Sequence, residues 1–296
     1  MNTPTGPDTS TTVALAPFWW GEERLRAYVG GLHEEIEAFF GPAELRALIV
    51  RDAMPSDPVR LAEALGLVPD PWQAEVLRSD SKRMLLNCCR QSGKSTTTAI
   101  LALHTALYSP DSLVLMVSPG LRQSSELFKK ALAFYRRLNR PVPASAETRL
   151  QLELVSGSRI ISLPGSADTS RGFSAVDLVL ADEASRIGDD MLASIRPMLA
   201  TSNGRMVAMS TPFGKRGWFY EAWEHGGDAW ERYRVAAGEV PRISAGFLLE
   251  ERKALGDLAF RSEYLTEFCD TDSQVFSSDL IDAALDDDLA PLWSAA

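Results

Sequence analysis

Four short apolar runs, separated by helical patterns, constrain the fold of this chain more than any other feature. The runs are residues 83–89, 113–117, 176–181 and 206–209. Short apolar strands that alternate with helices are typical of a mostly parallel sheet flanked by helices. In such α/β sheets, ligands bind at the carboxyl ends of the strands. The sequence therefore predicts an α/β fold whose functional residues follow these runs.

The segments around these runs predict a division of the chain into four parts. Residues 1–17 are rich in Thr, Ser and Pro and predict a flexible leader, and residues 18–66 predict N-terminal helices. Residues 67–245 form the expected core, which includes a hairpin around Ser156-Gly157. Residues 246–296 predict a small helical subdomain and an acidic tail.

Two Asp-Pro pairs predict the starts of helices near the N-terminal side of the core. They are Asp57-Pro58 and Asp70-Pro71. Asp suits the N-cap because its carboxylate accepts from backbone N–H groups of the first turn, and Pro suits the first helical position. We therefore expect one helix to begin at residue 58 and another at residue 71.

The composition narrows the class of protein. With 45% hydrophobic and 24% charged residues, the chain is typical of globular proteins. Three cysteines are too few and too oddly placed for a disulfide framework, which fits a reducing cytoplasm. No apolar run reaches the ~18 residues of a membrane helix. The net charge of −10 argues against a protein that coats DNA, but it permits a local basic patch.

The first apolar run leads into a loop with the features of a phosphate-binding site. Residues 89–96 read Cys-Arg-Gln-Ser-Gly-Lys-Ser-Thr. Gly93 would let the backbone approach phosphates, Lys94 would reach the β- and γ-phosphates, and Ser95 would offer its hydroxyl to Mg²⁺. The usual pattern GxxxxGK[ST] is incomplete, because its first glycine is replaced by Cys88. On the tripeptide alone, a surface turn that opens a helix is an equal alternative.

The third apolar run ends in two acids, Asp182 and Glu183. Asp182 would hold Mg²⁺, directly or through water, and Glu183 would orient and deprotonate an attacking water. The alternative is a solvated acid pair that caps the next helix. The phosphate loop upstream favours the catalytic interpretation, because hydrolysis of a nucleoside triphosphate needs both features at one site.

Two weaker motifs accompany these. Ser210-Thr211-Pro212 follow the fourth run, where hydroxyl groups could sense a γ-phosphate, and an ordinary Pro-containing turn is an equal alternative. Trp72 and Gln73 precede the loop. The amide of Gln73 could pair with an adenine edge, since it offers both a donor and an acceptor. Without further context, a buried Trp beside a solvent-facing Gln is the simpler interpretation.

Basic residues gather in residues 121–140, which hold six Lys or Arg and one acid. Helical spacing predicts that most of them share one side of a helix. They would contact DNA phosphates or a neighbouring subunit, and the alternative is a solvated helix face. The residues concerned are Lys129, Lys130, Arg136, Arg137 and Arg140.

Taken in order, these motifs resemble the ATPase domain of phage terminase large subunits, the motors that package viral DNA into procapsids. The resemblance covers roughly residues 65–276, and the order of the motifs makes it specific. The residues that carry it are Gln73, Arg90 to Thr96, Val117 to Pro119 with Gln123, Leu163 to Gly165, Arg171 to Ser174, Asp182 to Ser185, Ser210 to Lys215 and Glu263 to Phe268.

The resemblance implies a P-loop NTPase fold of the RecA/helicase-like type, with ATP and Mg²⁺ as cofactors. It also implies that Gln73 reads adenine, that Arg90 stabilises charge on the γ-phosphate, and that Ser210-Thr211-Pro212 couples hydrolysis to movement. In this family the loop commonly lacks its first glycine. The remaining nucleotide contacts would come from Gln91, Ser92, Gly93, Lys94, Ser95 and Thr96.

The resemblance also implies partners and a setting. These are double-stranded DNA, a portal protein, a small terminase subunit, a ring of identical subunits and the cytoplasm of a host cell. Terminase large subunits usually continue into an RNase H-like nuclease, and the 26 residues after Asp270 are too few for a domain of about 100 residues. We therefore expect no nuclease activity in this chain and allow for a separate nuclease polypeptide. The alternatives are a non-catalytic nucleotide-binding assembly component and a helicase-like ATPase on other nucleic acid.

Overall fold

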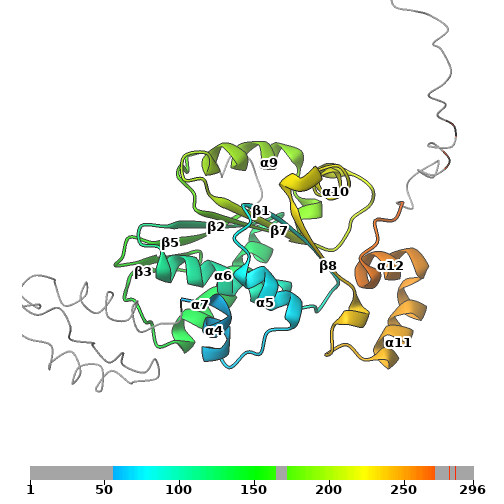
Figure 1. Cartoon of the computed structure of the whole chain (residues 1–296), viewed down its shortest axis with the longest axis horizontal. Helices are drawn as coiled ribbons and strands as arrows, with labels where there is room; N and C mark the ends of the chain where they lie inside the picture. The colour runs from blue at the N-terminus through cyan, green and yellow to red at the C-terminus, as the bar shows by residue number, and fades with distance from the viewer. Residues whose placement is uncertain (1–55, 165–171, 271–279, 281–283, 285–296) are drawn as a thin grey trace, which may run out of the picture.

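The computed structural model describes residues 56–164, 172–270, 280 and 284 (Figure 1). The expected leader, most of the N-terminal helical segment and most of the acidic tail lie outside these residues. Within the described ranges, no helix combines the length and hydrophobicity that a membrane crossing requires.

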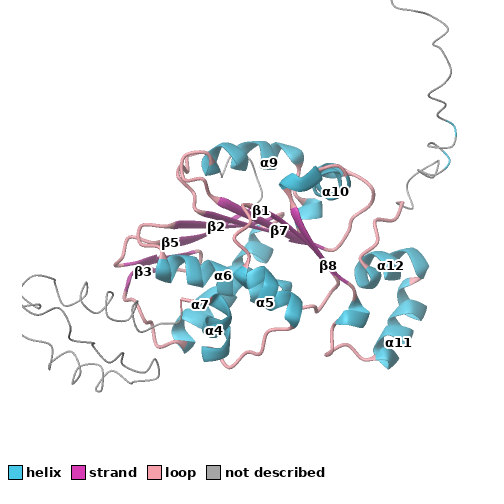
Figure 2. Cartoon of the chain, in the orientation of Figure 1, coloured by secondary structure: helices cyan, strands magenta, loops and turns pink. Residues whose placement is uncertain are grey.

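An eight-stranded sheet lies at the centre of the described part of the chain (Figure 2). Its strands are β1 (Arg83–Cys88), β2 (Leu113–Ser118), β3 (Ala144–Glu147), β4 (Gln151–Leu154), β5 (Arg159–Pro164), β6 (Leu178–Asp182), β7 (Arg205–Ser210) and β8 (Glu231–Val235). The strand order is β3-β4-β5-β2-β6-β7-β1-β8. All neighbours from β5 to β8 pair in parallel, whereas β3, β4 and β5 pair antiparallel at one edge.

Helices cover both faces of this sheet. In Figure 1, α4 to α7 lie on one face, and α9 and α10 lie on the other. The helices are α4 (Pro58–Ala64), α5 (Pro71–Arg78), α6 (Lys94–Tyr108), α7 (Leu121–Arg137), α9 (Asp189–Ile195), α10 (Gly217–Glu224), α11 (Ala245–Leu255) and α12 (Asp257–Leu265), with 3₁₀ turns η1 (Ala184–Arg186), η2 (Arg196–Leu199), η3 (Gly227–Ala229) and η4 (Ala237–Glu239).

The four apolar runs form β1, β2, β6 and β7, as the sequence predicts. These strands are neighbours in the middle of the sheet, and their interior residues are buried on both faces. One core cluster includes Met84 with side chains from α4 to α7. The other includes Leu85 with Met191 of α9 and Phe219 of α10. Burial on both faces explains why these strands are continuously apolar rather than alternating.

Both Asp-Pro pairs begin helices as expected. The side chain of Asp57 accepts a hydrogen bond from the backbone N–H of Val59 at 3.0 Å, and α4 begins at Pro58. At α5, the backbone N–H of Asp70 donates to Gln73 Oε1 at 2.8 Å. This second contact fixes Gln73 at the start of α5, beside the loop that follows β1.

Two edge strands, β3 and β8, are not predicted by the sequence. Each belongs to the edge of the sheet, and the residues of β3 are all half-buried or exposed. A strand that buries little carries no apolar run for a pattern to detect. The predicted hairpin is confirmed, since β4 and β5 pair antiparallel across Ser156-Gly157.

The C-terminal helices α11 and α12 follow β8, in the region predicted to be helical. Helix α11 buries none of its residues, whereas α12 buries Phe260 and Tyr264 in the same core cluster that contains Leu61 of α4. The backbone N–H of Arg90 donates to the Glu263 carbonyl of α12, so this helix lies close to the loop between β1 and α6.

Candidate functional site

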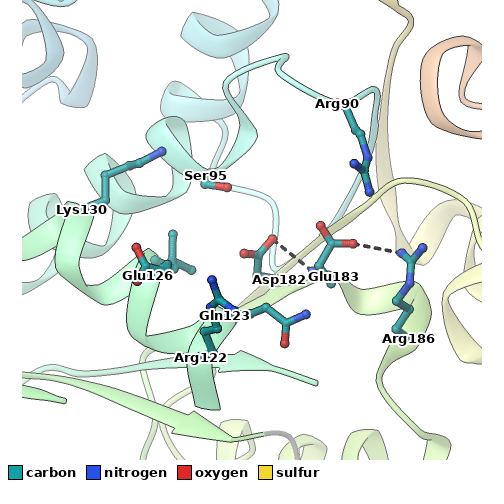
Figure 3. Close-up of a pocket in the computed structure, with 10 residues that line it drawn as sticks. Arg90, Ser95, Arg122, Gln123, Glu126, Lys130, Asp182, Glu183 and Arg186 are labelled. Carbon is teal, nitrogen blue, oxygen red and sulfur yellow. Dashed lines mark hydrogen bonds and ion pairs between the residues drawn. The ribbon is translucent and has the colours of Figure 1, made fainter. Parts of the chain in front are cut away.

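A cleft of about 740 Å³ opens at the carboxyl ends of the central strands (Figure 3). Its walls come from the loop after β1, from the segment after β6 and from the first half of α7. This is the edge at which ligands bind in parallel α/β sheets. The lining residues are Arg90, Ser95, Arg122, Gln123, Glu126, Leu127, Lys130, Asp182, Glu183 and Arg186.

The loop from β1 into α6 requires a glycine at its end. Gly93 has a φ of +97°, in the left-handed region that glycine adopts without strain. A Cβ at this position would lie 2.5 Å from Gln73 Nε2. Helix α6 begins at Lys94, and the first N–H groups of a helix have no partners within it. The loop therefore presents a helix N-terminus, which favours anions.

The structure brings the lysine of this loop and the twin acids together. Lys94 Nζ lies 4.0 Å from Glu183 Oε1. Lys94 is 9% exposed and Asp182 is 8% exposed. Lys94 and Ser95 begin α6, while Asp182 ends β6, and only β7 separates β6 from β1 in the sheet. The cleft is thus lined by Ser95, Asp182 and Glu183, which come from distant parts of the sequence, and Lys94 lies beside Glu183.

Burial changes the acidity of Asp182. Loss of hydration and the neighbouring Glu183 carboxylate raise the pKa of Asp182 to about 6. The ionised form is therefore disfavoured unless positive charge is close by. Strongly perturbed carboxylates of this kind concentrate at functional sites.

Glu183 adopts an unusual backbone conformation. Its φ of +52° lies in the left-handed region, which costs of order 1 kcal/mol or more for a residue other than glycine. Its backbone N–H donates to Asp182 Oδ1 at 3.1 Å, and its Oε2 accepts from Arg186 Nη1 at 3.1 Å. The strained turn directs the Glu183 carboxylate toward the loop after β1 (Figure 3).

Arg90 lines the cleft but is held by α12. Its Nε donates to Glu263 Oε2 at 2.9 Å, and its backbone N–H donates to the Glu263 carbonyl at 3.1 Å. The Glu263 carboxylate raises the pKa of Arg90 above its usual value. A role on a γ-phosphate would require the guanidinium to exchange this carboxylate for the phosphate.

Gln73 is buried against the loop, so the simpler interpretation of a solvent-facing glutamine is wrong. It is 8% exposed, and its Nε2 donates to the Ser92 carbonyl at 3.4 Å. Arg242 reaches the same carbonyl at 2.9 Å and pairs with Asp70 at 2.8 Å. The sequence did not predict this burial because Gln73 is covered by the loop, which follows it by about twenty residues. The adenine role stays a prediction.

The segment 210–212 is tied to two parts of the site. Ser185 Oγ lies 2.6 Å from Ser210 Oγ and donates to the Thr211 carbonyl at 2.9 Å. The Pro212 carbonyl accepts from Ser262 Oγ of α12 at 2.9 Å. The segment therefore connects the turn after Glu183 to α12, as a coupling element would need to do.

Helix α7 carries four of the five basic residues on a sector of about 120°, as the spacing predicts, and these are Lys129, Lys130, Arg136 and Arg137. Lys130 lines the cleft and donates to Thr96 Oγ1 at 3.3 Å, and burial lowers its pKa. Lys129 lies a quarter-turn away and pairs with Glu126 at 2.7 Å. Arg140 lies beyond the end of α7.

The other arginines of this stretch contact the protein itself. Arg136 and Arg140 both pair with Glu147 of β3, and the guanidinium of Arg137 lies next to Gly66. Contact with DNA or with a neighbouring subunit stays a prediction for these residues.

Several cleft residues were not predicted as site residues. Arg122, Glu126 and Arg186 line the cleft, and Glu263 pairs with Arg90 from α12. One feature of the sequence could have predicted Arg186 as a site residue. It lies three residues after Glu183, and side chains at this spacing meet on a helical turn. For Glu263, local sequence offers no such signal, because its partner lies far along the chain.

Comparisons with known proteins agree with the motif order. The family model described as "Terminase large subunit, T4likevirus-type, N-terminal" matches residues 85–282. The large terminase subunit of Thermus virus P23-45 is 29% identical over 259 residues, covering 75% of this chain and 53% of the relative. That of Escherichia phage T5 is 25% identical over 225 residues, covering 72% and 51%. The chain spans about half the length of the curated relatives it matches.

Solved structures share the fold. The large terminase ATPase domain of Thermus phage P74-26 aligns with a TM-score of 0.63 and 27% identity, covering 70% of this chain and 96% of that domain. A large terminase from a thermophilic bacteriophage, solved with ADP, aligns with a TM-score of 0.56 and 10% identity, covering 68% and 54%. The expected P-loop NTPase type of α/β fold is confirmed. The chain belongs to the terminase large subunit family, and its matched part is the ATPase region.

Proposed function

We propose that this chain hydrolyses ATP and uses the energy to move double-stranded DNA into a viral procapsid. The observation that carries the proposal is the 4.0 Å approach of Lys94 Nζ to Oε1 of Glu183, which lines a cleft together with Ser95 and Asp182. A cation at a helix N-terminus beside two acids is the arrangement that phosphoryl transfer to water requires. The similarity to the P74-26 ATPase domain supports the same activity.

Each residue of the cleft has a role in this proposal. The N-terminus of α6 and Lys94 bind the phosphates, and Gly93 allows the close approach of the backbone. Glu183 orients a water and accepts its proton, while Arg90 leaves Glu263 to neutralise charge on the γ-phosphate. Lys130, which lines the cleft, adds positive charge from the side of α7.

The residues present fit a magnesium ion. Ser95 and Asp182 offer a hydroxyl and a carboxylate within one cleft, and Mg²⁺ is held in such sites by one or two protein oxygens together with phosphates and waters. The buried Asp182, with its raised pKa, is suited to a cationic neighbour. When bound, Mg²⁺ would neutralise phosphate charge during hydrolysis.

The motor role extends the proposal to partners. Ser185, the segment 210–212 and Ser262 form a continuous set of contacts from the base to α12, which supports coupling of hydrolysis to movement. We propose that the active form is a ring of identical subunits, working with a portal protein and a small terminase subunit in the host cytoplasm. Adenine recognition by Gln73 belongs to the same proposal.

The test is to separate binding from hydrolysis with two variants. Glu183→Gln should keep its affinity for a fluorescent ATP analogue and lose about 10²–10⁴-fold in phosphate release, because the water loses its base. Lys94→Ala should lose binding. Glu183→Gln with parental turnover would remove the assignment of the base. A parent that binds ATP without hydrolysing it, even with DNA present, would favour a non-catalytic assembly component.

A further inference from the structure

We propose that Arg186 is a positioning residue for Glu183, and that it links the orientation of this base to the segment after β7 and to α12. The inference rests on the proposed function, because it gives the Glu183 carboxylate a role in hydrolysis. Arg186 is carried by the 3₁₀ turn η1 and lines the cleft, with 31% of its side chain exposed.

Two cations share the Glu183 carboxylate. Arg186 Nη1 lies 3.1 Å from Oε2 (Figure 3), while Lys94 Nζ lies 4.0 Å from Oε1. The backbone N–H of Arg186 also donates to the Glu183 carbonyl at 2.9 Å, which closes the turn. When Lys94 turns to phosphates, Oε1 becomes available to a water while Arg186 still holds Oε2. The carboxylate then keeps one orientation instead of rotating.

The ring of Phe213 forms a platform that orients Arg186. Its guanidinium lies 4.5 Å from the centre of the Phe213 ring, and Arg216 lies 5.0 Å from the same ring. Guanidinium groups stack on aromatic faces with a preferred geometry. Phe213 directly follows Ser210-Thr211-Pro212, so the platform moves with the segment that is proposed to couple hydrolysis to movement.

Arg186 also contacts α12. Arg186 Nη2 lies 3.8 Å from Glu263 Oε1, and the other oxygen of Glu263 accepts from Arg90 at 2.9 Å. Arg186 therefore touches the base, the segment after β7 and α12 at once. A partly exposed ion pair three residues apart contributes little to folding. These contacts instead fix the direction of one carboxylate.

The experiment compares Arg186→Ala, Arg186→Lys and a matched control, Arg216→Ala, which removes the other arginine of the Phe213 ring. Arg186→Ala should lower kcat at least tenfold and leave both KM and the affinity for a fluorescent ATP analogue within twofold. Arg186→Lys should recover part of kcat, because it keeps the charge but not the planar fork. Arg216→Ala should stay within twofold of the parent.

A second measurement needs no nucleotide. In hydrogen exchange of the protein alone, Arg186→Ala should speed exchange of the amides at residues 183–187, and Arg216→Ala should not. Glu183→Gln is assayed alongside to keep the inference separate from the proposed function. If Glu183→Gln loses turnover while Arg186→Ala keeps it, or if exchange at 183–187 is unchanged, the inference is overturned alone. A parent without hydrolysis would overturn the proposed function and this inference with it.

Discussion

Among single residues, Asp182 combines two opposing properties. It is a carboxylate at the end of a buried strand, where an oxygen ligand for a cation is useful, and burial beside Glu183 raises its pKa to about 6. An ionised group in such surroundings destabilises the fold. Asp182 therefore lowers the stability of the fold while it raises the affinity of the site for cations, as is common in active sites.

The raised pKa of Asp182 predicts how the stability of the fold depends on pH. The pKa of Asp182 is higher in the folded chain than in the unfolded chain, so between about pH 4 and 6 the folded state binds more protons. Its contribution to the free energy of unfolding is therefore greatest below pH 4 and is lost as the pH rises through about 6. A shift of roughly two pKa units corresponds to about 2–3 kcal/mol.

The variant Asp182→Asn removes this charge. At pH 7.5, urea denaturation of the protein without nucleotide should show an unfolding free energy about 1–3 kcal/mol higher than that of the parent, and the difference should shrink toward pH 4. A variant that is less stable than the parent at pH 7.5 would mean that Asp182 is stabilised by contacts of its ionised form.

The positions of site residues could be predicted where the residues belong to a motif at the end of a predicted strand. Gly93, Lys94 and Ser95 follow a strand and open a helix, as their motif predicts. The contacts of Arg90 and Gln73 could not be predicted, because their partners belong to α12 and to the loop. Pairing through space depends on the packing of whole elements, which no local pattern records.

Among the elements, α12 is the one that holds the cleft in its present arrangement. Glu263 pairs with Arg90, and Ser262 holds the Pro212 carbonyl. Both contacts join α12 to residues that follow sheet strands. A small movement of this helix would therefore change the position of Arg90 and of the segment after β7 together.

The variant Glu263→Gln should release Arg90 toward the cleft and remove a negative charge that repels phosphates. We expect affinity for a fluorescent ATP analogue to rise about 3–10-fold, with a smaller effect at high salt. Glu267→Gln is the matched control, because Glu267 pairs with Arg261 at 2.7 Å rather than with a cleft residue. If both variants raised this affinity equally, the cause would be the change in net charge and not the release of Arg90.

The strands that could be predicted from the sequence are the buried ones. The central strands are apolar throughout because helices cover both of their faces. Helices α4 and α5 could be predicted because each has an N-cap residue followed by Pro. In contrast, β8 reads Glu-Arg-Tyr-Arg-Val at the edge of the sheet, where pairing with β1 decides the structure and side-chain pattern does not.

For the whole molecule, the sheet order explains why the site exists. The parallel strands β2, β6, β7 and β1 are neighbours, so the loops after them open on one edge. The phosphate loop, the acid pair and the segment 210–212 meet there although more than 100 residues separate the first from the last. The net charge of −10 further requires that any DNA contact be local.

The proposed activity requires that one triphosphate bind between Lys94 and Glu183. The most direct measurement is a crystal structure with Mg²⁺ and a non-hydrolysable ATP analogue. We predict that the γ-phosphate lies between these two side chains, and that Ser95 and Asp182 each hold Mg²⁺ either as a direct ligand at about 2.1 Å or through a bound water. An analogue bound elsewhere, with Lys94 still facing Glu183, would contradict the account.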